Sequence, residues 1–295
     1  MIINKSSQLP DRLTVVKDLN LTASMRDGTV LKADVYRPDT HRKYPVLLAR
    51  TPYDKLLDQH VEQARKLAEL GYLVVVQDVR GRYASDGEFR PGFFSAYHHD
   101  TEDGHDTVEW AASLPWSTGK VGTFGNSYVG WTQWELAHSR PSHLTAMMPQ
   151  GIAANLLDRE LSGILRLGRV LWWSINSLAP DQRRKASAKW GPRTLEDAET
   201  LWAEGDRSKW LWYLPLMDIP DEVMFGIKPH FKSWLKDRTT DHFRFLEKHS
   251  NIDVPALTIT GWYDQQIGSI KHFTGMSKNG RTERAREGQR LIIGP

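Results

Sequence analysis

The sequence predicts an α/β fold, a doubly wound and mostly parallel sheet that a helical insertion interrupts. Three observations predict it. Short apolar runs alternate with amphipathic runs from residue 44 to residue 150, at the spacing of right-handed strand–helix–strand crossovers. Between about residues 152 and 250 the apolar spacing is helical and no strong strand is visible. The alternation then resumes. We therefore expect a core in two parts, 1–151 and 251–295, around an insertion at 152–250.

The expected elements follow the chain in order. Residues 21–25 and 29–38 alternate in character around the turn "RDG" and predict a β-hairpin. The runs 44–51 and 72–80 are typical of buried strands, and the amphipathic run 60–70 predicts a helix closed by glycine. The remaining elements are helices at 106–116 and 127–139, strands at 120–125 and 143–150, and, after the insertion, a strand at 254–264, a helix near 267–273 and a strand at 290–295.

Composition excludes several classes of protein. Apolar residues make up 40% of the chain and charged residues 25%, which is normal for a soluble globular protein. The net charge is only +3 and the basic residues are scattered, so nucleic-acid binding is not expected. No apolar run reaches the roughly 18 residues of a membrane span, and no signal-peptide core is visible. The absence of cysteine excludes disulfides, thiolate metal sites and a cysteine nucleophile, and it suits a cytoplasmic location.

The stretch "GTFGNSYVG" places Ser127 between a predicted strand and a predicted helix. A serine becomes nucleophilic when it projects from a sharp strand-to-helix turn, with small residues around it and a base beside it. Gly125 is one such small residue, but Val129 stands where a second glycine is usual, and Gly130 comes one position later. The alternative is that Ser127 is an ordinary helix N-cap, which would need no partners elsewhere in the chain.

Two stretches elsewhere offer such partners. Asp264 in "TITGWYD" follows a late strand, in the chain order Ser, Asp, His that is typical of α/β-hydrolases, and it could orient a histidine. Tyr53 in "RTPYDK" follows the first buried strand, where its hydroxyl could join the backbone N–H of Tyr128 in an oxyanion hole. Each also has an ordinary interpretation, Asp264 as a loop aspartate and Tyr53 as an aromatic residue packed under a proline turn.

Four motifs together carry a family resemblance. They are "RTPYDK", "DVRGRYASDGEF", "GKVGTFGNSYVGWTQWELA" and "VPALTITGWYD", in this order over most of residues 12–295. With them the sequence resembles the cocaine esterase and X-prolyl dipeptidyl-peptidase family of serine hydrolases. The resemblance implies an α/β-hydrolase core, a helical cap inserted after the nucleophile helix, and a C-terminal β jelly-roll domain. It also implies that a residue larger than glycine is tolerated at Val129.

The resemblance assigns roles to four residues. It implies that Ser127 is the nucleophile and Asp264 the acid of a Ser-His-Asp triad. It implies that Tyr53 and the backbone N–H of Tyr128 form the oxyanion hole. No cofactor belongs to this mechanism.

The resemblance also makes the insertion 152–250 a cap that would close an apolar acyl pocket. The insertion is rich in tryptophan, so we expect Trp131, Trp172 and Trp173 as candidate pocket residues. The alternative for each is packing between cap and core.

Two charged stretches have structural interpretations. We expect Arg80, Arg82, Asp86 and Glu88 to form an internal ion-pair network that braces the loop beside the nucleophile. The histidines and acids of "HHDTEDGHD" could suggest a metal site. However, acidic residues are expected where a helix begins, so we predict no metal there.

The family places its catalytic histidine just after a strand of the form "LIIGP", and this chain ends there at Pro295. We expect the histidine and the jelly-roll domain to lie beyond it, in a longer enzyme of which this is the N-terminal portion. His138 and His143 lie around the end of the nucleophile helix, and we interpret them as surface residues rather than as the base.

The three residues after Asp264 bear on the substrate. Relatives that hydrolyse amino-acid esters have acidic residues there, which hold a substrate ammonium, whereas this chain has Gln265, Gln266 and Ile267. The sequence therefore favours a hydrolase of carboxylic esters, with a small ester or short peptide as substrate. An X-prolyl dipeptidyl-peptidase type and a non-catalytic remnant or binding protein stay open as alternatives, and so does a homo-oligomer.

Overall fold

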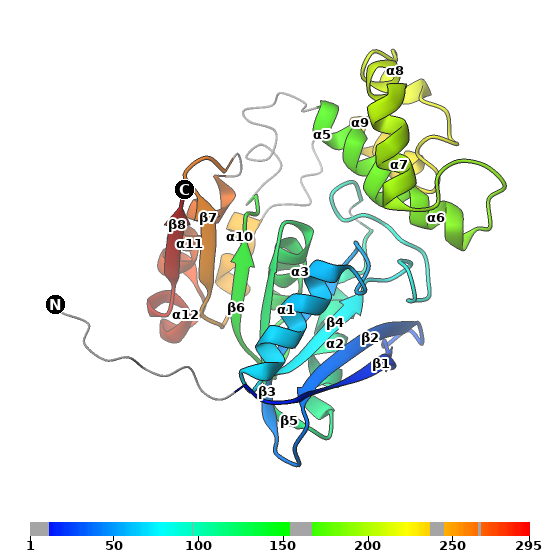
Figure 1. Cartoon of the computed structure of the whole chain (residues 1–295). Coiled ribbons are helices and arrows are strands. Elements are labelled where there is room, and N and C mark those ends of the chain that lie inside the picture. The colour runs from blue at the N-terminus through cyan, green and yellow to red at the C-terminus, as the bar shows by residue number, and fades with distance from the viewer. Residues whose placement is uncertain (1–11, 96, 154–166, 237–244, 265–266) are drawn as a thin grey trace.

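The computed structural model describes residues 12–95, 97–153, 167–236, 245–264 and 267–295. Its centre is an eight-stranded sheet with the order β1-β2-β4-β3-β5-β6-β7-β8 (Figure 1). The pairs β1–β2 and β2–β4 are antiparallel and the other neighbours are parallel, so the predicted α/β class is confirmed. The strands are β1 (Val15–Ser24), β2 (Val30–Pro38), β3 (Tyr44–Thr51), β4 (Leu73–Asp78), β5 (Ser117–Asn126), β6 (Leu144–Gln150), β7 (Leu257–Gly261) and β8 (Arg290–Gly294).

Helices cover both faces of this sheet. On one face α1 packs against Val74 and Val76 of β4, and on the other α2, α3 and α11 share a larger core with Val75. Alternate residues of one strand therefore enter two separate cores, and β4 is buried along its whole length. The helices of this core are α1 (Asp58–Glu69), α2 (Asp100–Ser113), α3 (Tyr128–Ala137), α11 (Gly268–Asn279) and α12 (Glu283–Glu287).

The insertion forms a group of helices beside the sheet (Figure 1). It comprises α5 (Leu167–Trp172), the π-helical turn η1 (Trp173–Leu178), α6 (Ala179–Lys185), α7 (Leu195–Leu201), η2 (Trp202–Asp206), α8 (Arg207–Leu211), η3 (Leu216–Asp218) and α9 (Lys228–Lys236). By contrast, α10 (Phe245–Lys248) packs on the core, because the ring of Phe245 lies 6.5 Å from that of Trp134 in α3. The expected boundary at residue 250 falls just beyond it, inside the turn η4 (His249–Asn251).

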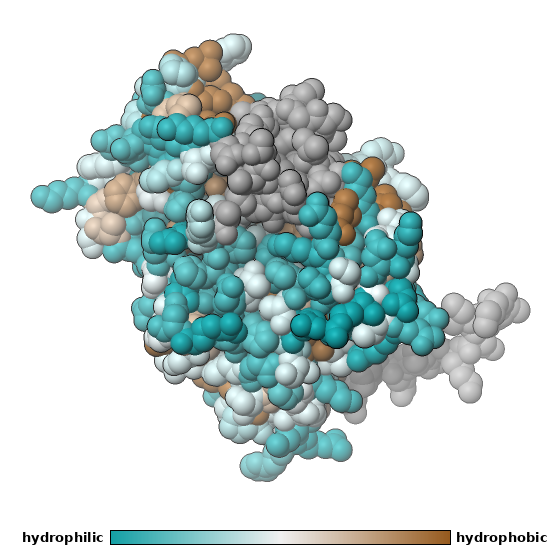
Figure 2. Space-filling model, turned by 180° about the vertical axis from the view of Figure 1, so that it is seen from behind, coloured by the Kyte–Doolittle hydropathy of each residue, from teal (hydrophilic) through white to brown (hydrophobic). Residues whose placement is uncertain are grey.

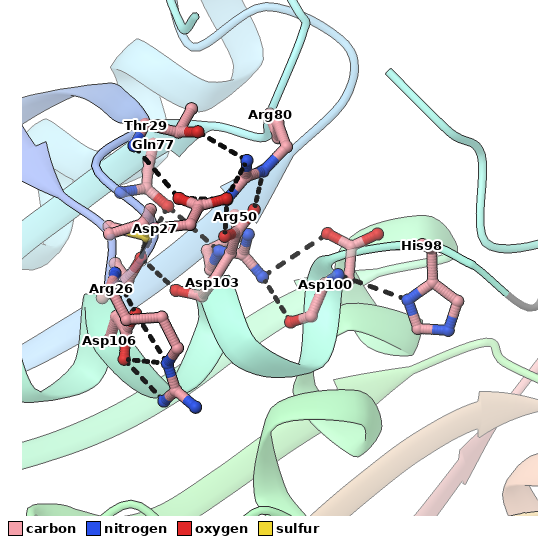
Figure 3. Close-up of polar contacts among 12 residues, drawn as sticks. Arg26, Asp27, Thr29, Arg50, Gln77, Arg80, His98, Asp100, Asp103 and Asp106 are labelled. Atoms are coloured by element: carbon pink, nitrogen blue, oxygen red, sulfur yellow. Dashed lines mark hydrogen bonds and ion pairs between the residues drawn. The ribbon is translucent and has the colours of Figure 1, made fainter. Parts of the chain in front are cut away.

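Helix α2 begins at Asp100, earlier than the predicted start in "DTVEWAASLPW". Asp100, Glu102 and Asp103 lie in its first turn, where carboxylates complement the positive end of the helix dipole. Two buried arginines fix this end (Figure 3). Arg50 donates to the backbone carbonyl of Asp100 at 3.0 Å, and Nη2 of Arg80 donates to Oδ1 of Asp103 at 2.6 Å. The acidic stretch therefore opens the helix as expected, although the helix begins at Asp100 rather than at Asp106.

The predicted network among Arg80, Arg82, Asp86 and Glu88 is wrong in its partners, because both arginines are internal but pair with residues of other segments and neither forms an ion pair with Asp86. Besides Asp103, Arg80 binds Asp27 at 2.7 Å (Figure 3). Arg82 binds backbone carbonyls of the insertion. Glu88 does not join this network as predicted, because it pairs with its neighbour Arg90 at the surface.

A pair of buried histidines lies in the core below α3. Nε2 of His249 lies 3.0 Å from Nδ1 of His272, and the ring of His272 stacks on Trp134 at 3.9 Å. Nε2 of His272 lies 3.4 Å from the carbonyl oxygen of Ala153. Burial lowers the pKa of His249 to about 4 and the pKa of His272 well below its ordinary value. Both rings are therefore neutral at pH 7.

This pair should make the fold sensitive to acid. The folded-state pKa values lie below the unfolded value of about 6.5, so the stability they contribute is present above pH 6.5 and is lost as the pH falls toward 4. We expect each histidine to lower the free energy of unfolding by up to about 1.4 kcal/mol per pH unit in that window. Urea unfolding at pH 7 and pH 5 measures this loss. A double variant with His249→Gln and His272→Phe should lose less, and an equal loss in both proteins would refute the explanation.

Hydrophobic side chains are exposed on the insertion, where Trp212 is 83% exposed and Leu214 is 77% exposed. Figure 2 shows a mostly hydrophilic surface, with hydrophobic residues gathered at the top over the helices of the insertion. Among the helices that the structure describes, none is long and apolar enough to cross a membrane.

Candidate active site

Ser127 lies at a sharp turn between β5 and α3. Its backbone angles are φ 58° and ψ −122°, a region that residues other than glycine rarely occupy. Its N–H donates to the carbonyl of Gln150 at 3.1 Å, and its own carbonyl accepts from Gly130 and Trp131 at 2.9 Å. The hydroxyl caps no N–H of the helix, so the N-cap interpretation does not hold. This strained strand-to-helix turn is the geometry from which a nucleophilic serine projects.

Gly125 makes room for this turn. Its φ of 136° lies in the region that favours glycine, and a Cβ atom there would lie 2.2 Å from Cγ1 of Val129. The residue that replaces the usual glycine at position 129 therefore fits because position 125 has no side chain.

Tyr53 follows β3 and is held by the insertion. Nε1 of Trp173 donates to its hydroxyl oxygen at 3.1 Å. Burial raises the pKa of Tyr53, against the opposite effects of its hydrogen bonds with Trp173 and Ser127. The phenol therefore stays protonated at neutral pH. Because Trp173 is a donor to the oxygen, the O–H of Tyr53 remains available as a donor on the side of Ser127.

The backbone N–H and the side-chain hydroxyl of Tyr128 have different surroundings. Its backbone N–H is the first of α3, where the helix supplies no acceptor, and it lies directly after Ser127. Its side chain is fully buried and its hydroxyl donates to Oδ2 of Asp100 at 2.9 Å. Burial raises the pKa of this phenol well above its ordinary value. The oxyanion role expected for Tyr128 can therefore concern its backbone N–H alone.

Asp264 follows β7 at the same edge of the sheet as Ser127. Oγ1 of Thr260 donates to Oδ2 of Asp264 at 3.0 Å. A Cβ atom built on Gly151, which follows β6, would lie 3.3 Å from Oδ2 of Asp264 and 2.7 Å from Oδ1 of Asn126. Asp264 and the residue before Ser127 therefore flank the same glycine.

A cavity of about 470 Å³ opens beside Ser127. Its wall combines the core with the insertion, since Tyr53 and Ser127 lie in it together with Trp172 and Trp173. The sequence suggests both of these tryptophans. It does not suggest several of the other wall residues, among them Gln59, His60 and Gln63 of α1, Arg169 of α5 and Leu195 of α7. The amphipathic pattern of residues 60–70 predicts α1 but gives no sign that its first turns face a cavity.

Trp131 does not line this cavity, which corrects its prediction as a pocket residue. It is fully buried, and its ring lies 4.9 Å from the rings of both Tyr128 and His98 and 5.7 Å from that of Phe93. Every residue of α3 is buried, so a side chain one turn after Ser127 enters the core. The packing alternative is the one that the structure shows.

No histidine hydrogen-bonds to Ser127 among the residues that the structure describes. His60 lines the same cavity, but its Nδ1 lies 2.7 Å from the carbonyl oxygen of Asp54. The histidines considered from the sequence have other partners: His98 the N–H of Asp100, His105 the hydroxyl of Ser139, His138 the carbonyl of Trp134 and His143 the carboxylate of Glu109.

The described ranges hold no group of three or more His, Asp or Glu that could bind a metal ion. Gln265 and Gln266 lie outside these ranges, and Ile267 directly precedes α11.

The chain matches a known family over most of its length. A family model described as X-Pro dipeptidyl-peptidase (S15 family) matches residues 27–295. A cocaine esterase from Rhodococcus sp. (strain MB1 Bresler) is 33% identical over 296 residues, which cover 94% of this chain and 48% of that protein. The chain therefore spans about half the length of this relative.

Solved structures show the same fold at lower identity. An aminopeptidase from a marine sediment Thaumarchaeota archaeon superposes with a TM-score of 0.66 at 18% identity, over 100% of this chain and 50% of that one. A CocE/NonD family hydrolase from Staphylococcus aureus gives 0.60 at 22% identity, over 95% of this chain and 46% of that one. These likenesses support the α/β-hydrolase fold.

Proposed function

Because the chain belongs to the X-Pro dipeptidyl-peptidase (S15) family, we propose that it is a serine hydrolase that cleaves carboxylic esters through an acyl-enzyme. Family membership supports a hydrolase of esters or peptides. The observation that carries the finer proposal is the strained turn of Ser127, which lies in the wall of a cavity beside a protonated Tyr53. An ester is favoured over an N-terminal dipeptide because no carboxylate lies in the described wall to hold an ammonium group.

In the proposed reaction, Oγ of Ser127 attacks the ester carbonyl while a histidine accepts its proton. The O–H of Tyr53 and the N–H of Tyr128 stabilise the oxyanion that forms. The intermediate collapses, the histidine protonates the departing alcohol, and the acyl group stays on Ser127. Water then repeats the sequence and releases the acid. Asp264 would orient the histidine.

The expected position of this histidine has a structural argument. The ends of β7 and β8 lie side by side, because the N–H of Trp262 donates to the carbonyl of Gly294 at 2.9 Å. A Cβ atom on Gly261 would lie 3.4 Å from the carbonyl oxygen of Pro295. A residue that follows Pro295 would therefore emerge near Asp264, which suits a base supplied from there.

The absence of cysteine supports a cytoplasmic location.

Labelling with a fluorophosphonate probe tests the nucleophile. We expect the full-length protein to be labelled and its Ser127→Ala variant to be unlabelled while the two unfold at the same urea concentration. If a histidine is the base, the labelling rate should rise with pH around a pKa of about 6.5. A folded full-length protein that the probe does not modify would count against an activated Ser127. A rate that stays flat up to pH 9 would count against the histidine.

A further inference from the structure

We propose that the cavity beside Ser127 selects substrates that carry a carboxylate, and that Arg169 is the residue that binds it. The inference rests on the proposed hydrolase function and names its substrate class. The substrate would be an ester whose acyl part ends in a carboxylate, such as a half-ester of a short dicarboxylic acid.

The charges in the cavity wall are the first support. Of the wall residues that the structure describes, Arg169 alone carries a formal charge at neutral pH. Tyr53 and Tyr83 are protonated, since burial raises the pKa of each phenol. His60 is neutral, since burial lowers its pKa. Among these described wall residues a bound ammonium would find no counter-ion, whereas a carboxylate would find a guanidinium.

The second support is that the guanidinium of Arg169 is available. Arg169 is exposed in α5, and it forms no ion pair or hydrogen bond within the described ranges. Other arginines of the insertion are engaged, such as Arg183 with the carbonyls of Glu222 and Val223 and Arg184 with Asp181. An unpaired cation at the edge of a cavity leaves its charge free for a ligand.

The third support is that this charge acts at the reacting centre. The positive charge of Arg169 is among the influences that lower the pKa of Tyr53, so it lies within electrostatic reach of the proposed oxyanion donor. A substrate with its ester at Ser127 and a carboxylate a few carbons away could therefore contact both ends of the cavity. Arginine suits this task because its planar fork can bind a carboxylate with two parallel hydrogen bonds.

The test compares Arg169→Gln with the unsubstituted protein, both at full length, on two matched esters. The esters are p-nitrophenyl hydrogen glutarate, which carries a carboxylate, and p-nitrophenyl butyrate, which does not. We expect the substitution to lower kcat/KM for the glutarate ester about tenfold, mainly through KM, because a hydrogen-bonded charge pair is lost. Hydrolysis of the butyrate ester should change less than about twofold.

Lys189→Gln is the matched control, because it removes the same charge. Lys189 is an exposed cation of the same insertion, and it lines neither the cavity of Ser127 nor the smaller one that also borders Arg169. An equal loss in this variant would mean a general effect of net charge and would overturn the proposal. An equal loss on both esters in Arg169→Gln would also overturn it, because Arg169 would then support the reacting anion rather than select the substrate.

Binding of glutarate itself needs no turnover. It therefore tests the carboxylate-binding role of Arg169 separately from the proposed hydrolase function. Isothermal titration should show glutarate binding to the Ser127→Ala protein, and about tenfold weaker binding when Arg169→Gln is added. If neither ester is hydrolysed and Ser127 is not labelled, the hydrolase function fails while glutarate binding still decides the role of Arg169. Absence of any glutarate binding, in a protein that hydrolyses the butyrate ester, would refute the role of Arg169 alone.

Discussion

Replacing Arg82 with alanine should lower the free energy of unfolding by about 3–5 kcal/mol. Arg82 is completely buried between the core and the insertion. Its Nε donates to the carbonyl of Pro52 at 2.8 Å, its Nη1 to that of Leu178 at 2.7 Å and its Nη2 to that of Ser177 at 2.9 Å. Asp181 lies 3.6 Å away. Alanine would leave three backbone carbonyls and the buried carboxylate of Asp181 without this partner.

The effect comes from the partners that remain, so the choice of substitution matters. Lysine keeps the charge of Arg82 but presents one ammonium in place of a planar fork, and it cannot reach three divergent carbonyls. We expect Arg82→Lys to recover only a minor part of the loss. Urea unfolding of both variants measures these values. Arg90→Ala is the control, because Arg90 forms a surface pair with Glu88 that should contribute about 1 kcal/mol or less. A similar small loss in Arg82→Ala would show that the insertion is held by other contacts.

Tyr53→Phe should reduce kcat by about 10²–10³-fold with little change in KM. The substitution removes one hydroxyl and keeps the ring, so the shape of the cavity is preserved. An oxyanion donor acts on the transition state more than on the bound ester, which is why the loss should appear in kcat. Hydrolysis of p-nitrophenyl butyrate at saturating substrate measures it.

Tyr44→Phe is the control for this experiment. Its hydroxyl also has a hydrogen-bond partner, Thr40 at 3.0 Å, but it lies at the opposite end of β3 from Tyr53. Activity of this control should match the unmodified chain. If Tyr53→Phe kept more than about half of kcat, the oxyanion would have to be held by other donors, with the N–H of Tyr128 as the first candidate.

The parts of this molecule that the sequence could predict are those set by local pattern. The continuous apolar run of β4 and the glycine-flanked turn of Ser127 each depend on a few neighbouring residues. The place of β4 between β2 and β3 does not, because hydrophobic pattern identifies a buried strand without naming its neighbours. The start of α2 escapes prediction because its buried acids resemble loop residues until Arg50 and Arg80 are seen against them.

The candidate site also has some residues that local pattern predicts and others that depend on distant contacts. Tyr53 is predictable because it follows a strand at the edge where the cavity opens. The contact between Arg82 and Ser177 spans 95 residues, and nothing near either residue indicates it. Trp131 and Trp173 look alike in the sequence, yet one is in the core and the other in the cavity wall. Which side of a helix faces a cavity depends on the packing of the whole insertion.

The hydrogen bond from Trp173 to Tyr53 has a consequence for how the substrate range of such a hydrolase can change. The tryptophan of the insertion that lines the cavity and the phenol proposed for catalysis are joined by one contact of 3.1 Å. The insertion therefore cannot be replaced by another cap without an effect on Tyr53. A graft of a cap with another residue at this position would alter turnover as well as substrate range. Laboratory evolution of new specificity should therefore keep a donor there, or recover it through second mutations close to Tyr53.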